Sequence, residues 1–302
     1  MEKRDFGKTG LQVTRLGLGL AEVSRHNDLA AAEDVGRVLN TALDGGINFI
    51  DTSACYGNTE ELIGATVAHR RHEYILATKC GHVIEGASGE PWTAPVVEES
   101  VDRSLARLRT DYLDLIQIHS CGVEVLEQGE IIDVLIKAKE AGKTRFVGFS
   151  GDNEAAHWAV DSGLFDTLQT SFNLVEQHAR TKRLFERAEA KGMGIIIKRP
   201  VANGAWGKAK SPYTYADEYF RRAQIMAKMG DLPGATEDFI LLAMGFVFAH
   251  PEVDTAIVGT RNPSHVASNI ELVERRLPIP AETVEELHRR FDEAGEDWSQ
   301  LT

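Results

Sequence analysis

The feature that most constrains the fold is a regular alternation of short apolar runs and longer segments with helical spacing. Each run has the length of an ordinary β-strand and is rich in β-branched or aromatic residues. The eight runs span residues 13–20, 48–53, 74–80, 112–119, 145–150, 167–172, 194–198 and 255–259. Strands that alternate with helices form parallel sheets, and eight such units in 302 residues match a (β/α)8 barrel. We therefore predict an α/β fold of the TIM-barrel type.

The segments between the runs carry helix signals that agree with this prediction. In segment 95–110 apolar residues recur at spacings of four, four and three, which is typical of a helix with one buried stripe. Pro95 stands where it can begin that helix. Left-handed glycine caps would end three other helices at Gly142, Gly163 and Gly192.

A doubly wound sheet is the alternative arrangement of the same elements. Its nucleotide-binding form carries G-x-G-x-x-G after the first strand, whereas here GLGL is followed by AEVSRHND, so the barrel is preferred. Ahead of the barrel, residues 4–12 predict a short β-hairpin with Lys8, Thr9 and Gly10 in its turn. No linker or low-complexity tract interrupts the chain, and we expect one domain over residues 1–302.

The charge of the chain limits its partners. The formal net charge is −13, whereas nucleic acids and anionic membranes attract basic surfaces, so neither is expected as a partner. The first residues contain no apolar leader, and the apolar run 239–250 is too short to span a bilayer. Three cysteines without an export signal favour reduced thiols. We expect a soluble cytoplasmic protein, with its oligomeric state open.

Ionisable residues end three consecutive predicted strands. Asp51 ends the second, Lys79 ends the third and His119 ends the fourth, and Tyr56 follows five residues after Asp51. In a (β/α)8 barrel the carboxyl ends of neighbouring strands meet at one rim, which is where the chemistry of such barrels takes place. Each residue alone could be structural, but three in neighbouring strands predict a functional cluster.

The chemistry of this cluster indicates proton transfer. A phenol with an ordinary pKa of about 10 is a poor proton donor at neutral pH unless a nearby cation stabilises its phenolate. Lys79 can supply that charge, Asp51 can hold the lysine protonated, and His119 can donate a hydrogen bond to a substrate oxygen. The cluster holds no oxidant or reductant, so a reduction would need a hydride from a cofactor.

A metal site is an alternative use of the same rim. Cysteine and histidine side chains gather there in sequence, at Cys55, Cys80, His82, His119 and Cys121. No pair repeats at the spacing of a zinc ribbon, and no H-x-H ends the first strand. We therefore predict that the protein has no metal cofactor.

Six motifs follow one another along nearly the whole chain: FIDTSACYGNTEELIG, LATKCG, DLIQIHS, VGFSG, LQTSFN and IVGTRNPSHVASN. In this order they resemble the aldo-keto reductase superfamily, in which D-T-x-x-x-Y-G with a downstream Lys and His is a specific signature. The resemblance implies a (β/α)8 barrel and metal-free, NADP(H)-dependent reduction of an aldehyde or ketone to an alcohol, or the reverse. It also implies a catalytic tetrad of Asp51, Tyr56, Lys79 and His119, with Tyr56 as the general acid or base.

The resemblance implies where the nicotinamide end of NADP would bind. Ser150 and Gln169 match the family positions that hold the carboxamide. After the seventh strand the family often has Tyr-Ser-Pro, with the tyrosine stacked on the nicotinamide, whereas this chain has Lys198, Arg199 and Pro200. The aliphatic stem and charge of Lys198 are thus expected near the ring or the diphosphate.

At the adenosine end the resemblance implies a clamp for the 2′-phosphate. Gly259, Thr260 and Arg261 match positions at the start of the last barrel helix, where free N–H groups and a guanidinium can bind an anion. His265 stands where many members have arginine, and Asn269 matches a position that contacts adenine. NADPH is therefore expected to be preferred over NADH.

Three segments after the strands are long and should wall the substrate pocket: 81–94, 120–129 and 203–234. Candidates to line it are Trp92, Trp206, Tyr213 and Tyr215. The choice among a sugar, a steroid and a small aldehyde stays open. An alternative function is that of a nucleotide-binding redox sensor or regulatory subunit on the same fold, since Cys55 adjoins Tyr56 and Cys80 adjoins Lys79.

Overall fold

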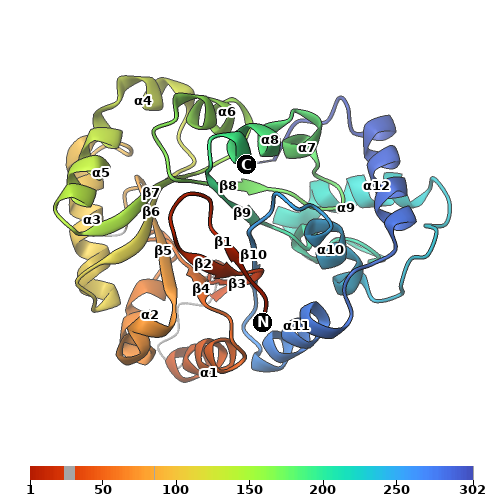
Figure 1. Ribbon diagram of the computed structural model, residues 1–302, viewed down its shortest axis with the longest axis horizontal. Helices are drawn as coiled ribbons and strands as arrows, with labels where there is room; N and C mark the ends of the chain where they lie inside the picture. The colour runs from red at the N-terminus through yellow and green to blue at the C-terminus, as the bar shows by residue number, and fades with distance from the viewer. Residues whose placement is uncertain (24–30, 85, 302) are drawn as a thin grey trace.

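A closed barrel of eight parallel strands forms the centre of the protein, in the order β10-β3-β4-β5-β6-β7-β8-β9 (Figure 1). The computed structural model describes residues 1–23, 31–84 and 86–301. The barrel strands are β3 (Leu16–Gly19), β4 (Phe49–Asp51), β5 (Ile75–Cys80), β6 (Leu113–His119), β7 (Thr144–Ser150), β8 (Thr167–Ser171), β9 (Gly194–Lys198) and β10 (Thr255–Gly259). The predicted TIM-barrel fold is confirmed.

Helices surround the barrel, as the ring of ribbons in Figure 1 shows. They are α1 (Ala31–Asp44), α2 (Thr59–Thr66), α3 (Ala94–Leu108), α4 (Val123–Gln128), α5 (Glu130–Glu140), α6 (Asn153–Ser162), α7 (His178–Thr181), α8 (Leu184–Ala190), α9 (Asp217–Ala227), α10 (Phe239–Phe248), α11 (Pro263–Arg275) and α12 (Ala281–Ala294), with 3-10 turns η2 (Ala68–Glu73), η3 (Ala202–Gly204) and η4 (Thr214–Ala216). Gly142, Gly163 and Gly192 adopt the predicted left-handed conformation at helix ends. No helix in the described ranges is both long and apolar enough to cross a membrane.

The first predicted strand, 13–20, is wrong as a single element. Its beginning belongs to β2 (Gln12–Thr14), which pairs antiparallel with β1 (Lys3–Asp5), and only β3 enters the barrel. The chain changes sheets at Arg15, where the Thr14 hydroxyl donates to Leu16 O (2.8 Å) and Asn48 Oδ1 accepts from Thr14 N (2.7 Å). The alternation of apolar residues continues across this corner, which is why the sequence pattern hides it.

The β1–β2 hairpin is confirmed, and it closes the amino end of the barrel. Figure 1 shows the hairpin lying across the ring of strands. Phe6 in its turn is fully buried, and its ring meets the ring of Phe49 edge-on at 5.7 Å between centroids. Lys8 N donates to Gly192 O (2.8 Å), which joins the hairpin to the residues before β9. The hairpin thus covers this end of the barrel, and the cavity described below opens at the opposite, carboxyl end of the strands.

The barrel interior changes from apolar to polar along the strands. Next to the hairpin lies an apolar cluster that includes Phe49, Ala77 and Leu115. Side chains two residues apart on a strand point the same way, so the next inward positions are Asp51, Lys79 and Gln117. The barrel thus presents a buried polar layer just below its open end.

Two of the predicted long loops contain helices. Segment 120–129 contains α4, and segment 203–234 contains η4 and α9. In segment 81–94, residue 85 lies outside the described residues. The walls of the open end are therefore more regular than the sequence suggests.

Candidate active site

A buried ion pair joins the ends of β4 and β5. Lys79 Nζ lies 2.6 Å from Asp51 Oδ1 and donates a second bond to Thr52 O (2.8 Å), and both side chains are almost inaccessible to solvent. Burial opposes the charge of Lys79, but the carboxylate of Asp51 and the phenol of Tyr56 outweigh it and hold the pKa of the lysine above its ordinary value. Lys79 is therefore a fixed, protonated cation.

Two amides complete the surroundings of the carboxylate. Asp51 Oδ2 accepts from Gln169 Nε2 (2.9 Å) and from Gln117 Nε2 (3.4 Å), and Ser150 Oγ donates to Gln169 Oε1 (2.9 Å). Ser150, Gln169 and Asp51 thus form one chain of hydrogen bonds across three strands. Because every partner is buried, the carboxylate has little freedom to move.

The phenol of Tyr56 lies above the ion pair. Lys79 Nζ lies 4.9 Å from the centroid of the Tyr56 ring, and the ring of His119 meets that ring edge-on at 5.8 Å. Burial raises the pKa of Tyr56 above its ordinary value, and the charge of Lys79 opposes this rise without cancelling it. The phenol is therefore protonated at neutral pH and able to act as an acid.

His119, at the end of β6, is held as a neutral imidazole. Burial, together with the charge of Lys79, keeps its pKa well below the ordinary value. Its Nδ1 lies 3.4 Å from Ser53 Oγ and 3.5 Å from Cys55 Sγ, and its backbone oxygen accepts from Trp92 Nε1 (2.9 Å). A neutral ring can still donate one hydrogen bond to a ligand.

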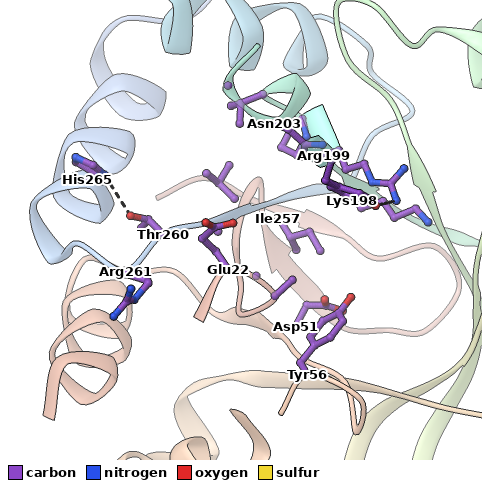
Figure 2. Close-up of a pocket in the computed structure, with 18 of the residues that line it drawn as sticks. Glu22, Asp51, Tyr56, Lys198, Arg199, Asn203, Ile257, Thr260, Arg261 and His265 are labelled. Carbon is purple, nitrogen blue, oxygen red and sulfur yellow. Dashed lines mark hydrogen bonds between the residues drawn. The ribbon is translucent and has the colours of Figure 1, made fainter. Parts of the chain in front are cut away.

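A cavity of about 710 Å3 opens at this end of the barrel. Figure 2 shows Arg261 and His265 at one end of it, Asp51 and Tyr56 at the other, and Lys198 and Arg199 on a further wall. Of the fourteen residues expected to act in catalysis or to bind the cofactor, eleven line the cavity: Asp51, Tyr56, His119, Gln169, Lys198, Arg199, Pro200, Gly259, Thr260, Arg261 and His265.

Three expected site residues do not line the cavity. Lys79 lies beneath it with its head on Asp51, and Ser150 reaches it only through Gln169. Asn269 is half-buried on α11. The structure therefore brings Asp51, Tyr56, Lys79 and His119 together, with Gln169 and Ser150 bonded in a chain to Asp51. Asn269, by contrast, is not part of the cavity wall.

Lys198 is paired with a carboxylate that the sequence analysis missed. Its Nζ lies 2.8 Å from Asp152 Oδ2, and Asp152 also accepts from Thr170 Oγ1 (2.8 Å) and Ser171 N (2.7 Å). Burial would raise the pKa of Asp152, but Lys198 and the Ser171 N–H outweigh it and hold that pKa below its ordinary value. Asp152 precedes α6 and reads as a helix cap in the sequence, so its position gave no sign of this contact.

Arg199 is fixed by the carboxyl-terminal residues. Its Nη1 donates to Leu301 O (3.0 Å) and its Nη2 contacts the Tyr215 hydroxyl. Tyr215 and Tyr213 line the cavity as expected. Trp206 does not, because it is packed in the core. Trp92 instead supports the backbone of His119.

The start of α11 differs from the expectation of free N–H groups. Asn262 caps the helix and accepts from Ser264 N (2.9 Å), and His265 N donates to Asn262 O (3.0 Å). Pro263 has no N–H. The N–H groups of Ser264 and His265 are therefore already used within the helix, and the exposed side chains of Arg261 and His265 are a guanidinium and an imidazole that this end offers an anion. His265 Nδ1 lies 3.2 Å from Thr260 Oγ1.

Gln117 is a further site residue that the sequence analysis missed. It is fully buried and lies two residues before His119 on β6, so both face the barrel interior. A signal was present, since a polar residue at an inward position of an apolar strand is uncommon.

Comparison with known proteins supports one family. A model of the Aldo/keto reductase family matches residues 15–289. L-galactose dehydrogenase of Arabidopsis thaliana is 29% identical over 300 residues, which cover 95% of this chain and 93% of the relative. 6-dehydroglucose reductase of Novosphingobium aromaticivorans is 28% identical and covers 90% of both chains. The holo form of an aldo-keto reductase from Bacillus halodurans has a TM-score of 0.80 at 25% identity, with 96% of both chains covered. With the match over residues 15–289, the chain belongs to the aldo/keto reductase family of oxidoreductases.

Proposed function

We propose that this protein reduces an aldehyde or ketone to an alcohol with NADPH, or catalyses the reverse reaction, with Tyr56 as the general acid or base. One observation carries the proposal: a protonated Lys79, held 2.6 Å from Asp51, faces the ring of Tyr56 at the base of an open cavity. A purely structural barrel has no need of a buried ion pair at this place, because such pairs are costly to bury.

The residues around the cavity fit a dinucleotide phosphate. Lys198, Arg199, Arg261 and His265 place cationic or imidazole groups on its wall, and guanidinium groups bind phosphate oxygens in a forked geometry. The carboxylate of Glu22 also lines the cavity, so the wall is not uniformly positive. At the barrel end, Gln169 is an amide within the chain of bonds to Ser150 and Asp51, which suits a carboxamide partner.

When bound, the nicotinamide cofactor would supply the hydride. Tyr56 would give its proton to the carbonyl oxygen, and burial keeps the phenol protonated until then. The phenolate left behind would be stabilised by Lys79, whose own charge is secured by Asp51. His119, neutral because of its burial, would donate a hydrogen bond to the same oxygen and so fix its direction.

The test is carbonyl-dependent loss of NADPH absorbance with an activated aromatic aldehyde, for the wild-type protein and Tyr56→Phe. The variant keeps the ring but loses the proton, so we expect turnover to fall by roughly 100-fold or more while NADPH affinity stays the same. Tyr74→Phe is the matched control, since its hydroxyl contacts Val67 O outside the cavity. A Tyr56→Phe variant with near-normal turnover would refute the proposal.

The relatives suggest which substrates to try next. Two of them are named for hexoses, L-galactose and 6-dehydroglucose, and another for pyridoxal. Oxidation of L-galactose with NADP+ and reduction of pyridoxal should be assayed beside the aromatic aldehyde. If the protein binds NADPH but turns over none of these substrates, the nucleotide-sensing alternative is favoured instead.

A further inference from the structure

Three potential metal ligands meet beside the catalytic tyrosine. Ligand atoms of Cys55, His82 and His119 all lie within 4.8 Å of one another. Cys55 Sγ lies 3.5 Å from His119 Nδ1, and the rings of His82 and His119 meet edge-on with centroids 4.8 Å apart. They come from three separate places along the chain: Cys55 follows β4, His82 follows β5, and His119 is the last residue of β6. Of the five thiols and imidazoles that the sequence placed at this rim, the barrel therefore brings these three together.

We propose that Cys55, His82 and His119 form a zinc-binding site at which Zn2+ reversibly inhibits the enzyme. The prediction from the sequence concerned a metal cofactor, and this site would hold an inhibitory ion instead. Metal binding itself is independent of the proposed carbonyl reduction, and only the inhibitory consequence rests on it.

The spacing of the ligand atoms suits zinc. Zinc binds sulfur at about 2.3 Å and imidazole nitrogen at about 2.1 Å, so a tetrahedral angle separates the two ligand atoms by about 3.6 Å. Cys55 Sγ and His119 Nδ1 lie 3.5 Å apart. A thiol and two imidazoles are the ligand types that zinc prefers over carboxylate-binding ions such as Mg2+. Three protein ligands would leave the fourth position to water.

The surroundings favour access to the site. Cys55 is exposed and His82 is half-buried, so an ion can arrive from solvent. The ring of Trp92 packs edge-on against His82 at 5.0 Å, and Trp92 Nε1 bonds His119 O, which limits the freedom of both imidazoles. Binding would exchange the thiol proton of Cys55 for the metal and release that proton to solvent.

The inhibitory effect follows from the position of His119. A metal on Nδ1 would fix the ring against Cys55, whose neighbour in the chain is Tyr56. His119 lines the cavity and lies edge-on to the ring of Tyr56, so the ion and its water would stand beside the reacting carbonyl. The bound ion should therefore inhibit turnover. Because it binds reversibly, a chelator should remove the inhibition.

The other thiols and imidazoles provide controls. Cys80 and Cys121 are buried, and neither belongs to the cluster. His250 Nε2 and His288 Nε2 lie 3.0 Å apart, which makes them a second imidazole pair without a thiol. Variants at Cys121 and His288 therefore separate the proposed site from general metal binding.

Cobalt titration tests binding without any enzyme assay. Co2+ replaces zinc in such sites, and a cysteine ligand adds a thiolate-to-cobalt charge-transfer band in the near ultraviolet. Untagged, reduced wild-type protein should develop this band with one Co2+ per chain, and Zn2+ should remove it. Cys55→Ser should abolish the band and His82→Gln should weaken Co2+ binding by roughly tenfold or more. Cys121→Ser and His288→Gln should behave as the wild type.

A second readout needs no variant. Zinc should protect Cys55 from alkylation in the wild-type protein, as measured by peptide mass spectrometry, and a chelator should restore alkylation. The proposal is overturned by a cobalt complex without the charge-transfer band, by a band that survives in Cys55→Ser, by unchanged affinity in His82→Gln, or by unprotected Cys55. If turnover is found, zinc should inhibit the wild type, and Cys55→Ser should lose this sensitivity relative to its own zinc-free rate. Undiminished inhibition in that variant would contradict the inhibitory role.

Discussion

The residues of the site depend on one buried carboxylate. Asp51 accepts from Lys79, Gln169 and Gln117, so a single side chain orients the cation and connects to the amides on two further strands. A buried ion pair of this kind adds little net stability, but breaking it is costly because it leaves one charge without a partner. The energetic consequence of a change therefore depends on which partner remains.

Lys79→Met should destabilise the fold by about 3–5 kcal/mol, since Asp51 would stay buried with no cation beside it. Urea unfolding followed by circular dichroism measures this. The double variant Asp51→Asn with Lys79→Met should recover part of the loss, because no uncompensated charge remains. Lys139→Met removes a lysine from a largely exposed pair with Asp166 and should cost about 1 kcal/mol or less. Equal losses in the two single variants would contradict this account.

Arg261 offers a test of cofactor preference at one residue. It is exposed at the end of the cavity away from Asp51 and Tyr56, where the N–H groups of Ser264 and His265 are already bonded to Asn262. Arg261→Ala should therefore weaken NADPH binding by roughly tenfold or more and leave NADH binding nearly unchanged, since only NADPH has a 2′-phosphate. Fluorescence titration measures both affinities. Arg275→Ala, at the far end of the same helix, is the control. Equal losses for both nucleotides would exclude a 2′-phosphate contact.

Single positions also show what the sequence could and could not predict. Asp51 and His119 end β4 and β6, and Lys79 is the penultimate residue of β5, so their convergence follows from barrel topology alone. Asp152 and Gln117 were missed because their roles depend on which way a side chain points and on partners distant in the chain. The sequence placed Cys55, His82 and His119 at one rim together with Cys80 and Cys121, but which of these side chains meet depends on their orientation once β4, β5 and β6 lie side by side.

At the scale of elements, the period of the apolar pattern and the length of each helix or strand decided which elements could be predicted. Barrel strands β4 to β10 and helix α3 were predicted, because apolar runs alternate along the chain with segments of helical spacing. Helix α4 has six residues between Gly122 and Gly129, too few for helical periodicity to emerge. The corner between β2 and β3 keeps the alternation of a strand, so only the pairing partners reveal two sheets.

The hairpin that closes the barrel gives an element-scale prediction from two glycines. Both have positive φ, +52° at Gly7 and +72° at Gly10, so an alanine at either position is strained. A Cβ at Gly7 would lie 2.4 Å from Gly194 N, whereas one at Gly10 would meet nothing within 4 Å. Gly10→Ala should thus lower the free energy of unfolding by about 1–2 kcal/mol. Gly7→Ala should lower it clearly more, because the hairpin must also move off β9. Urea midpoints compare them. Equal costs would mean that the hairpin does not dock closely.

At the scale of the whole molecule, burial of histidines couples stability to pH. Burial is the largest cause that lowers the pKa of five described histidines: His82, His119, His157, His250 and His288. The unfolded chain binds protons at these groups near pH 6.5 and the folded chain does so only at lower pH. The stability they contribute is therefore complete above about pH 6.5 and is lost as the pH falls toward their folded pKa values.

His250 and His288 contribute to this pH dependence as a pair, which joins the end of α10 to α12. Burial lowers the pKa of both to about 4. The carbonyl of Phe246 lies 2.9 Å from His250 Nδ1 and requires a proton there, so His250 Nε2 accepts from His288 Nε2 at 3.0 Å. Protonation of His250 Nε2 would place a second proton between the two Nε2 atoms, which are only 3.0 Å apart. Nearby Arg180 adds a further charge that opposes it.

We therefore expect the free energy of unfolding to fall as the pH is lowered from about 6.5 to 4, with His250 alone contributing on the order of 3 kcal/mol. Asp254 acts in the opposite sense, because burial raises its pKa to about 6 and its stabilisation is lost as the pH rises through that value. The double variant His250→Gln with His288→Gln keeps the contribution of Asp254 but loses that of the two histidines. Its free energy of unfolding should therefore depend less on pH between about 4 and 6.5 than that of the wild type. Urea unfolding at a series of pH values measures both curves, with His69→Gln, an exposed histidine, as the control. Parallel curves for the wild type and the double variant would show that the buried pair is not a source of the acid sensitivity.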